Sequence, residues 1–149
     1  MARALRGIVL DAGPVVSLLV DEPSAGEIAD ALRDAESLRI SVVNVAEVVD
    51  VTRRVHGVPA EEAAVAVSRF LNEVARPVPA TREHATRAGD LRARHNHRRD
   101  RDLSLADCFV IAAAEPGDTV ATSDRAVAFV ARAEGLDVLA LPNARGRRP

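Results

Sequence analysis

The sequence contains no lysine, no tryptophan and no tyrosine, and phenylalanine occurs at three positions only, Phe70, Phe109 and Phe129. The core must therefore be built from Ala, Val, Leu and Ile. Scarce aromatic rings also argue against a protein that binds single-stranded nucleic acid by stacking its bases. Because lysine is absent, all 20 basic residues are Arg. Arg binds phosphate well through paired hydrogen bonds, but we attribute the Arg-only composition mainly to genomic base bias.

Cysteine and long apolar runs are scarce as well. A single cysteine, Cys108, excludes an intramolecular disulfide, and its apolar neighbours indicate a small buried side chain rather than a nucleophile. No apolar run approaches the length of a membrane span. The first residues lead directly into a predicted strand, so we expect no signal peptide. Together these features predict a cytoplasmic protein.

Strand and helix patterns alternate along the chain of 149 residues, of which 48% are apolar. This length suits one domain with a real core, and the alternation indicates parallel β-α-β units in an α/β fold. Strands are predicted at residues 7–11, 38–41, around Val78, 119–122 and 137–141. Helices are predicted at residues 14–20, 24–35, 42–56, 59–75, 81–95, 105–115 and 125–134. We assign residues 1–142 to one domain and residues 143–149 to a flexible, Arg-rich tail.

Two serines are predicted to begin helices. Ser24, with Glu27 three residues later, has the pattern of a capping box. Ser41 is the predicted cap of the next helix, which Gly57 ends.

Three acidic residues lie where a predicted strand meets a helix. Asp11 ends the first apolar run, Asp124 follows the fourth predicted strand, and Asp107 begins a helical pattern. In an open parallel sheet, the carboxyl ends of the strands and the adjoining helix starts share one edge, where α/β proteins place their sites. Carboxylates gathered there raise one another's pKa values, and Mg²⁺ or Mn²⁺ favours such oxygen ligands. The pattern therefore predicts a metal site for phosphate chemistry.

These three residues also have an ordinary structural interpretation. Asp is a favoured N-cap, so Asp11 and Asp124 can cap the helices that follow them. Asp107 stands three residues after Ser104 and can complete a capping box. Each interpretation is plausible alone, and only the joint occurrence of the acids favours a site.

A fourth acid, Glu47, lies within a predicted helix rather than at its start. Helical spacing puts Asn44, Glu47 and Arg54 near one face, so a solvent-facing polar stripe is the alternative interpretation.

The order of the four acids and their flanking residues resembles the PIN-domain family, and more narrowly the VapC toxins of bacterial VapBC toxin–antitoxin pairs. The resemblance extends over essentially the whole chain. Each matching segment is weak alone, but four in the right order and separation are strong. The segments are Val9–Gly13 (VLDAG), Ser41–Val48 (SVVNVAEV), Leu103–Ala114 (LSLADCFVIAAA) and Val120–Asp124 (VATSD).

The resemblance implies a three-layer α/β/α sandwich with a central, mostly parallel five-stranded sheet. It also implies a Mg²⁺-dependent endoribonuclease, with Mn²⁺ able to substitute, and catalytic roles for Asp11, Glu47, Asp107 and Asp124. Asp11, Asp107 and Asp124 are the expected metal ligands. Glu47 is either a ligand or the base that orients the attacking water, and the sequence does not separate these roles.

Around this implied site, Thr122 and Ser123 are the expected supporting residues. One departure from the family pattern is Gly13, where many members have Ser, and the lost hydroxyl is expected to weaken metal binding modestly. The resemblance further implies a VapB-like antitoxin as partner and a homodimer.

An RNA substrate needs positive charge near the acidic edge. The basic stretch before the Asp107 helix offers it, and Arg98, Arg99 and Arg101 are the candidates for RNA contact. A solvated helix end and loop is an equally good interpretation. His95 and His97 lie in the same stretch, but two His without a third ligand indicate surface residues more often than a metal site.

Two other classes of function compete with a nuclease. An aspartyl phosphatase or phosphotransferase of the haloacid-dehalogenase type needs a second Asp two residues after the first, where this chain has Gly13, and it lacks the usual Lys. A non-catalytic binding module with the same fold is the second alternative. Metal binding without RNA cleavage would favour it.

The first predicted helices carry more apolar residues than one helix face can bury. Some of them are predicted to form a groove for an amphipathic segment of the antitoxin, and packing beneath the sheet is the alternative. The residues are Val15, Val16, Leu18, Leu19, Val20, Ile28 and Leu32.

Overall fold

The computed structural model describes residues 7–149. The start of the chain, where we expect no signal peptide, lies outside the described residues. The strands are β1 (Gly7–Leu10), β2 (Ser37–Ser41), β3 (Arg76–Val78), β4 (Thr119–Thr122) and β5 (Asp137–Ala140). The helices are α1 (Ala12–Leu19), α2 (Ala25–Leu32), α3 (Val42–Arg54), α4 (Ala60–Glu73), α5 (Arg82–His95), α6 (Leu105–Ala112) and α7 (Arg125–Ala133).

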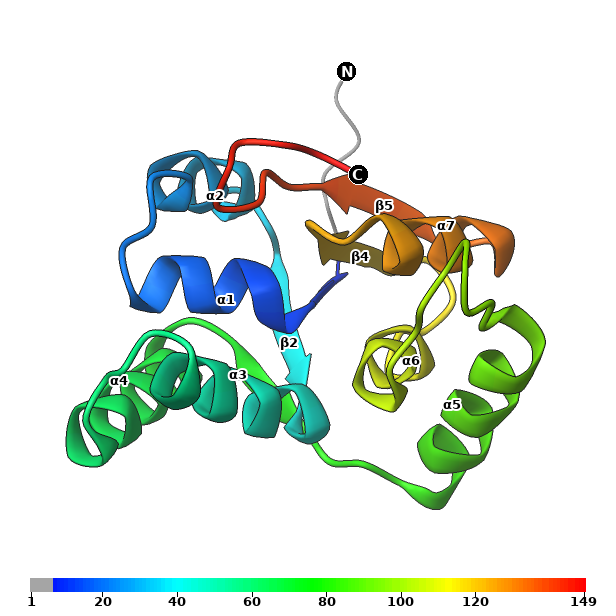
Figure 1. Cartoon of the computed structure of the whole chain (residues 1–149), viewed down its shortest axis with the longest axis horizontal. Helices are drawn as coiled ribbons and strands as arrows, with labels where there is room; N and C mark the ends of the chain where they lie inside the picture. The colour runs from blue at the N-terminus through cyan, green and yellow to red at the C-terminus, as the bar shows by residue number, and fades with distance from the viewer. Residues whose placement is uncertain (1–6) are drawn as a thin grey trace.

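The strands form one sheet in the order β3-β2-β1-β4-β5, and every pairing is parallel. Figure 1 shows α1, α3 and α4 on one side of the sheet and α5, α6 and α7 on the other. The predicted α/β sandwich with a parallel five-stranded sheet is therefore confirmed. From β1 the chain continues to β2 on one side, whereas β4 lies on the other, so the topological switch point lies between β1 and β4. Open parallel sheets bind ligands at the carboxyl ends of the strands at such a point.

Alternate residues of β1 belong to two separate hydrophobic clusters. Ile8 and Leu10 pack with α1, α2 and α3, whereas Val9 packs with α5, α6 and α7. All three side chains are completely buried, as the central strand of a sheet covered on both faces requires. The core is almost entirely aliphatic, as predicted, and Phe70 is its one fully buried aromatic ring among the described residues. Cys108 is also buried, and burial raises the pKa of its thiol to about 11, so it is no ready nucleophile.

Several helix ends differ from the sequence prediction. α1 begins at Ala12, before Pro14, because the cap is Asp11 itself. The predicted capping box at Ser24 is wrong. The backbone of Ser24 is already helical, with φ −83° and ψ −7°, so its hydroxyl does not reach the amides of the first turn and makes no hydrogen bond with the described residues. Ser41 does cap α3, accepting from Val43 N at 3.3 Å.

Residues 143–149 fold back over the sheet edge. Arg148 Nη1 donates to the carbonyl oxygen of Ala140 at 2.6 Å, and the same guanidinium pairs with Glu27 of α2. The flexibility of this tail stays a prediction. None of the helices within residues 7–149 combines the length and apolarity that a membrane crossing needs.

Candidate functional site

Asp11 stands directly after β1, at the switch point of the sheet. Its backbone amide continues the ladder to β4 by donating to Ala121 O at 2.9 Å. Its side chain is 5% exposed, and both carboxylate oxygens accept one hydrogen bond. Oδ1 accepts from Ala12 N at 2.8 Å, and Oδ2 accepts from the hydroxyl of Thr122 at 2.6 Å. The fold therefore holds this carboxylate in one orientation.

Thr122, at the end of β4, connects two of the predicted acids. Its hydroxyl donates to Asp11 and accepts from the backbone amide of Asp124 at 2.9 Å. Asp124 in turn caps α7, because its Oδ1 accepts from Ala126 N at 2.7 Å and from Val127 N at 3.0 Å. Its Oδ2 makes no hydrogen bond with the described residues, and the side chain reaches solvent.

Asp107 lies in the first turn of α6 and completes the capping box that its spacing from Ser104 suggests. Ser104 N donates to Asp107 Oδ2 at 2.7 Å, and Asp107 N donates to the hydroxyl of Ser104 at 3.0 Å. The capping interpretation is thus correct for Asp11, Asp107 and Asp124. It does not exclude a site, since Asp107 and Asp124 each retain one carboxylate oxygen that bonds to none of the described residues.

Glu47 reaches the same place from α3, and the alternative interpretation of a solvent-facing stripe fails because Asn44 is buried. Asn44 is completely buried, and its amide nitrogen donates to Ala106 O of α6 at 3.0 Å and to Glu47 Oε2 at 3.4 Å. Arg54 instead lies exposed and pairs with Asp50 at 2.7 Å. Asn44 was missed as a site residue; its signal was an amide three residues before Glu47 in an otherwise apolar stretch. It positions Glu47 beside the start of α6.

The electrostatics of the four acids show that the fold brings them together. Burial raises the pKa of Asp11 to about 7, and the negative charges of Asp107 and Glu47 add to the effect. Burial and the charge of Asp107 raise the pKa of Glu47. Burial also raises the pKa of Asp107, with a further contribution from the charge of Asp124. Within residues 7–149, none of these carboxylates forms an ion pair with Arg or His. The site therefore concentrates negative charge that no side chain neutralises.

A hard divalent cation suits this set of donors, because it prefers carboxylate oxygens and relieves their mutual repulsion. Asp11, Asp107 and Asp124 are the residues that would hold it. In the part of the chain that the structure describes, however, no three His, Cys, Asp or Glu side chains are spaced closely enough to hold a metal ion as they stand. The metal-binding roles of these residues stay a prediction.

Gly13, the departure from the family pattern, lies against Ser123. A Cβ atom at position 13 would lie 3.0 Å from the hydroxyl oxygen of Ser123, closer than an ordinary contact. Ser123 therefore brings a hydroxyl next to the position where a Ser at residue 13 would carry one. A side chain at position 13 would require this hydroxyl to move.

The basic loop after α5 folds into a tight turn in which His97 and Arg101 pair as an antiparallel bridge. Arg98 and Arg99 are exposed at its tip. His95 is half-buried and contacts Glu134 at 3.0 Å, and His97 contacts Asp100 at 3.1 Å, so both have structural partners.

Arg101 faces a pocket beside the acids. Its guanidinium carbon lies 4.2 Å from the ring centroid of Phe129, a side chain that is 48% exposed. The pocket holds about 580 Å³, and we call it the Asp124 pocket. Its lining includes Asp100, Arg101, Asp102, Asp124, Phe129 and Asn143. Phe129 was not singled out by the sequence, because one Phe in a helix has the pattern of a core residue.

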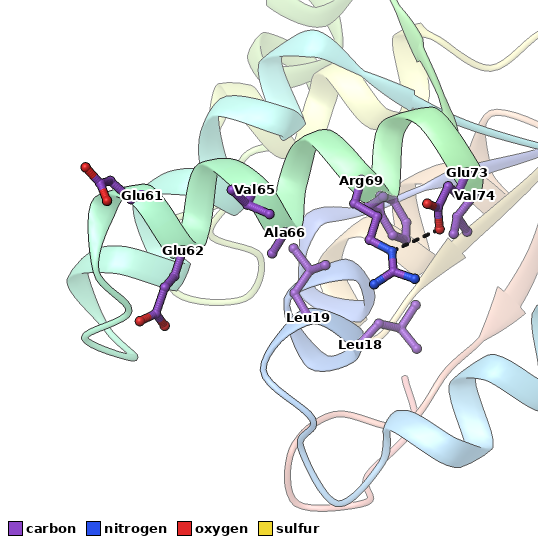
Figure 2. Close-up of a pocket in the computed structure, with 10 residues that line it drawn as sticks. Leu18, Leu19, Glu61, Glu62, Val65, Ala66, Arg69, Glu73 and Val74 are labelled. Atoms are coloured by element: carbon purple, nitrogen blue, oxygen red, sulfur yellow. Dashed lines mark hydrogen bonds and ion pairs between the residues drawn. The ribbon is translucent and has the colours of Figure 1, made fainter.

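A second, more apolar hollow of about 600 Å³ lies between α1 and α4. Figure 2 shows Leu19 of α1 next to Ala66 of α4 and Leu18 near Arg69, and we call this hollow the α1–α4 groove. Of the residues predicted to form a groove, only Leu18 and Leu19 line this one, and its occupant stays a prediction. Four of the other predicted residues, Val15, Val16, Ile28 and Leu32, are buried in the core. Charged side chains stand around the groove: Glu61, Glu62, Arg69 and Glu73.

Known proteins resemble this chain in family and in fold. A family model described as "PIN domain" matches residues 8–135. No curated protein matches the sequence.

Solved structures share the fold at low sequence identity. FitAcB from Neisseria gonorrhoeae has a TM-score of 0.61 and 21% identity over 89% of this chain and 96% of its own. VapC20 from Mycobacterium tuberculosis, described as a sarcin–ricin loop cleaving toxin, has a TM-score of 0.59 and 18% identity over 87% and 84%. A toxin–antitoxin complex from Klebsiella pneumoniae has a TM-score of 0.57 and 18% identity over 78% and 86%.

Proposed function

Because this chain belongs to the PIN domain family, we propose that it is a metal-dependent endoribonuclease and the toxin of a type II toxin–antitoxin pair. One observation above all supports this function. Four carboxylates gather at the switch point of the sheet, and burial together with the neighbouring negative charges raises the pKa values of three of them, Asp11, Glu47 and Asp107. No Arg or His among the described residues forms an ion pair with any of the four. Carboxylates with no counter-charge destabilise the fold, so their presence together is better explained by a binding function than by a structural one.

The chain's own residues divide the work at this site. Mg²⁺ or Mn²⁺, when bound, would neutralise charge on the scissile phosphate and make a bound water more acidic. Asp11, Asp107 and Asp124 would hold the ion. Thr122 fixes the carboxylate of Asp11 from the other strand. Glu47, which Asn44 positions and whose pKa is raised, is suited to accept a proton from the attacking water.

RNA is the substrate that the neighbours favour, since VapC20 is described as cleaving the sarcin–ricin loop. In this chain Arg101 lines the same pocket as Asp124, with Arg98 and Arg99 nearby on the loop. These side chains would contact the RNA, and Arg98 and Arg99 would bind phosphates beside the cleaved bond.

The partner would be an antitoxin with an amphipathic helix that fills the α1–α4 groove. The Klebsiella pneumoniae neighbour is a toxin–antitoxin complex. The groove offers apolar contacts from Leu18, Leu19 and Val65, and its acidic rim suits a helix with basic flanks. An Arg of that partner would serve as a counter-charge for the carboxylates. A homodimer of the toxin is part of the same proposal, and light scattering of the purified protein tests it.

The test is cleavage of structured RNAs by purified protein with Mg²⁺, with Mn²⁺ and with excess EDTA. Cleavage that depends on either metal and disappears with the chelator is the expected result. The Asp107→Asn variant, purified in parallel, controls for contaminating nucleases. Metal binding without cleavage would favour a non-catalytic binding module instead. Undiminished cleavage in EDTA would exclude a metal mechanism.

Co-expression with the neighbouring open reading frame tests the partner. The expected result is growth arrest by this chain alone, relief by the neighbour, and co-purification of the two. If the chain neither arrests growth nor co-purifies with the neighbour, the toxin role is contradicted, and the family assignment is unaffected.

A further inference from the structure

Phe129 is the most exposed aromatic ring in the described chain, and it lies beside the acidic site. Phe70 is buried and Phe109 is half-buried, whereas 48% of Phe129 is exposed. Exposed aromatic side chains are the surfaces on which proteins stack single-stranded bases, so the place of this ring beside the acidic site is informative. The scarcity of aromatic residues argues against stacking of many successive bases. It does not exclude the binding of one base at a single aromatic side chain.

The guanidinium of Arg101 lies over the face of this ring, so that Phe129 supports it from one side. The guanidinium carbon lies 4.2 Å from the centroid of Phe129. Two backbone hydrogen bonds, each 2.8 Å long, pair His97 with Arg101, and Arg101 Nε approaches His95 O at 3.4 Å. The turn thus holds the guanidinium in place. Arginine planes and aromatic rings are the two kinds of surface on which proteins stack unpaired bases.

The charges of the Asp124 pocket suit a base better than a phosphate. Asp100, Asp102 and Asp124 outnumber Arg101 and Arg125 among its lining residues, so a phosphate inside it would be repelled. Asp100 contacts His97, but Asp102 makes neither an ion pair nor a hydrogen bond with the described residues. Its carboxylate can accept from the exocyclic amino group of a base, as acidic side chains accept from cytosine N4.

We propose that the Asp124 pocket is a nucleobase subsite of the RNA substrate. A base next to the scissile phosphate stacks on the guanidinium of Arg101, which Phe129 supports from its other side, and the exocyclic amino group of the base donates to Asp102. The subsite therefore prefers adenine, cytosine or guanine to uracil, which has no exocyclic amino group. This inference rests on the proposed nuclease function, since Asp124 lines both the subsite and the acidic cluster.

The absence of tryptophan from the chain gives a direct test. Phe129→Trp places a unique fluorophore in the subsite. A 12-nucleotide unstructured RNA containing cytosine, added in EDTA so that it is not cleaved, is expected to quench this fluorescence. Inorganic polyphosphate, which carries charge without bases, is expected to leave it unchanged. An oligonucleotide of uracil alone is expected to bind at least several-fold more weakly.

Matched variants separate stacking from charge. Phe129→Leu keeps apolar bulk but loses the π face, and we expect it to raise KM for RNA roughly 5- to 150-fold with little change in kcat. Asp102→Ala removes the acceptor for the exocyclic amino group and is expected to abolish the preference for cytosine over uracil. Arg99→Gln removes a positive charge from the exposed tip of the same loop and is expected to weaken binding of both oligonucleotides equally.

The outcomes distinguish this inference from the proposed function. If wild-type protein cleaves RNA but RNA leaves the fluorescence of the Phe129→Trp variant unchanged and Phe129→Leu keeps its KM, the subsite is wrong and the nuclease stands. Quenching by polyphosphate, or equal quenching by both oligonucleotides, overturns base recognition by this pocket. A fluorescence change that only the co-expressed antitoxin produces makes the pocket a protein interface and also overturns it. Base-dependent quenching by a protein that cleaves no RNA supports the subsite and contradicts the nuclease.

Discussion

The buried carboxylates at the two ends of the central strands differ in whether an ion pair neutralises them. At the amino end of β4, Asp118 is buried and paired with Arg39 of β2, whose side chain is equally shielded. At the carboxyl end of β1, Asp11 is buried without an ion pair and lies near further carboxylates. The fold can therefore neutralise a buried acid when stability alone is at stake. The missing counter-charge at the carboxyl end is what the proposed cation site requires.

Neutralising the acids at the carboxyl end should have the largest effect on activity. Asp11→Asn and Asp124→Asn are each expected to reduce RNA cleavage roughly 100- to 1,000-fold, the scale of losing one group that stabilises the transition state. Because Asn caps a helix about as well as Asp, the fold should persist. Cleavage assays and circular dichroism measure the two effects separately. Wild-type activity in both variants would leave only the capping role.

Removing the acid at the amino end of the strands should reduce stability and leave activity unchanged. Asp118→Asn removes the close partner of the buried Arg39, leaves it only a 3.9 Å contact with Glu115, and is expected to lower the free energy of unfolding by up to about 3–5 kcal/mol. Urea denaturation measures this loss. The specific activity of the protein that stays folded should equal that of the wild type, since Asp118 lies at the other end of the strands. A selective loss of activity in folded Asp118→Asn would refute this division of roles.

The pH dependence of stability sharpens the contrast further. The pKa of Asp11 is about 7 in the folded protein, against 3.8 for an ordinary Asp. Between these values the folded protein holds a proton that the unfolded chain has released, so the free energy of unfolding falls as pH rises from about 4 to 7. The full penalty above pH 7 amounts to at most about 4 kcal/mol. Thermal melts of metal-free Asp11→Asn should therefore show higher stability than wild type at pH 8 and no such gain at pH 4.

The smallest expected effect concerns the hydroxyl between the two strands. Thr122→Val removes the hydrogen bond to Asp11 Oδ2 and is expected to reduce cleavage about tenfold, as is common for groups that orient metal ligands. Thr122→Ser keeps the hydroxyl and should retain most of the activity. Comparing kcat/KM of the two variants isolates the hydroxyl from the methyl group. Equal losses in both would show that packing at β4 matters instead.

Much of this site was accessible from the sequence because its acids follow local signals. Asp11 and Asp124 end apolar runs, and Asp107 stands at capping distance from Ser104, so each position follows from a few neighbouring residues. The parallel sheet also follows from the alternation of helix and strand patterns. Local signals predicted that Ser24 begins a capping box, but the backbone there was already helical, which only the packing of α2 decides.

Other features depend on contacts between distant segments. Asn44 has the local pattern of a surface residue, and only the packing of α3 on α6 buries it against Ala106, 62 positions away. Phe129 lies on the face of α7 opposite to the buried Val127 and Val130. What it contacts there is decided by the distant turn that carries Arg101. Ser123 comes close to Gly13 because β1 and β4 are neighbours in the sheet. The sequence contains no local mark of these pairings.

The double use of three acids as helix caps affects the entropy of ligand binding. Asp11, Asp107 and Asp124 each have an oxygen held by backbone amides, which restricts the rotamers of the side chain before any ligand arrives. Immobilising a free side chain at a binding site costs about 0.5–1.5 kcal/mol. For these three carboxylates, folding has already removed much of that side-chain entropy. A cation bound as proposed would draw together side chains whose rotamers helix formation already restricts, so helix formation would contribute to its affinity.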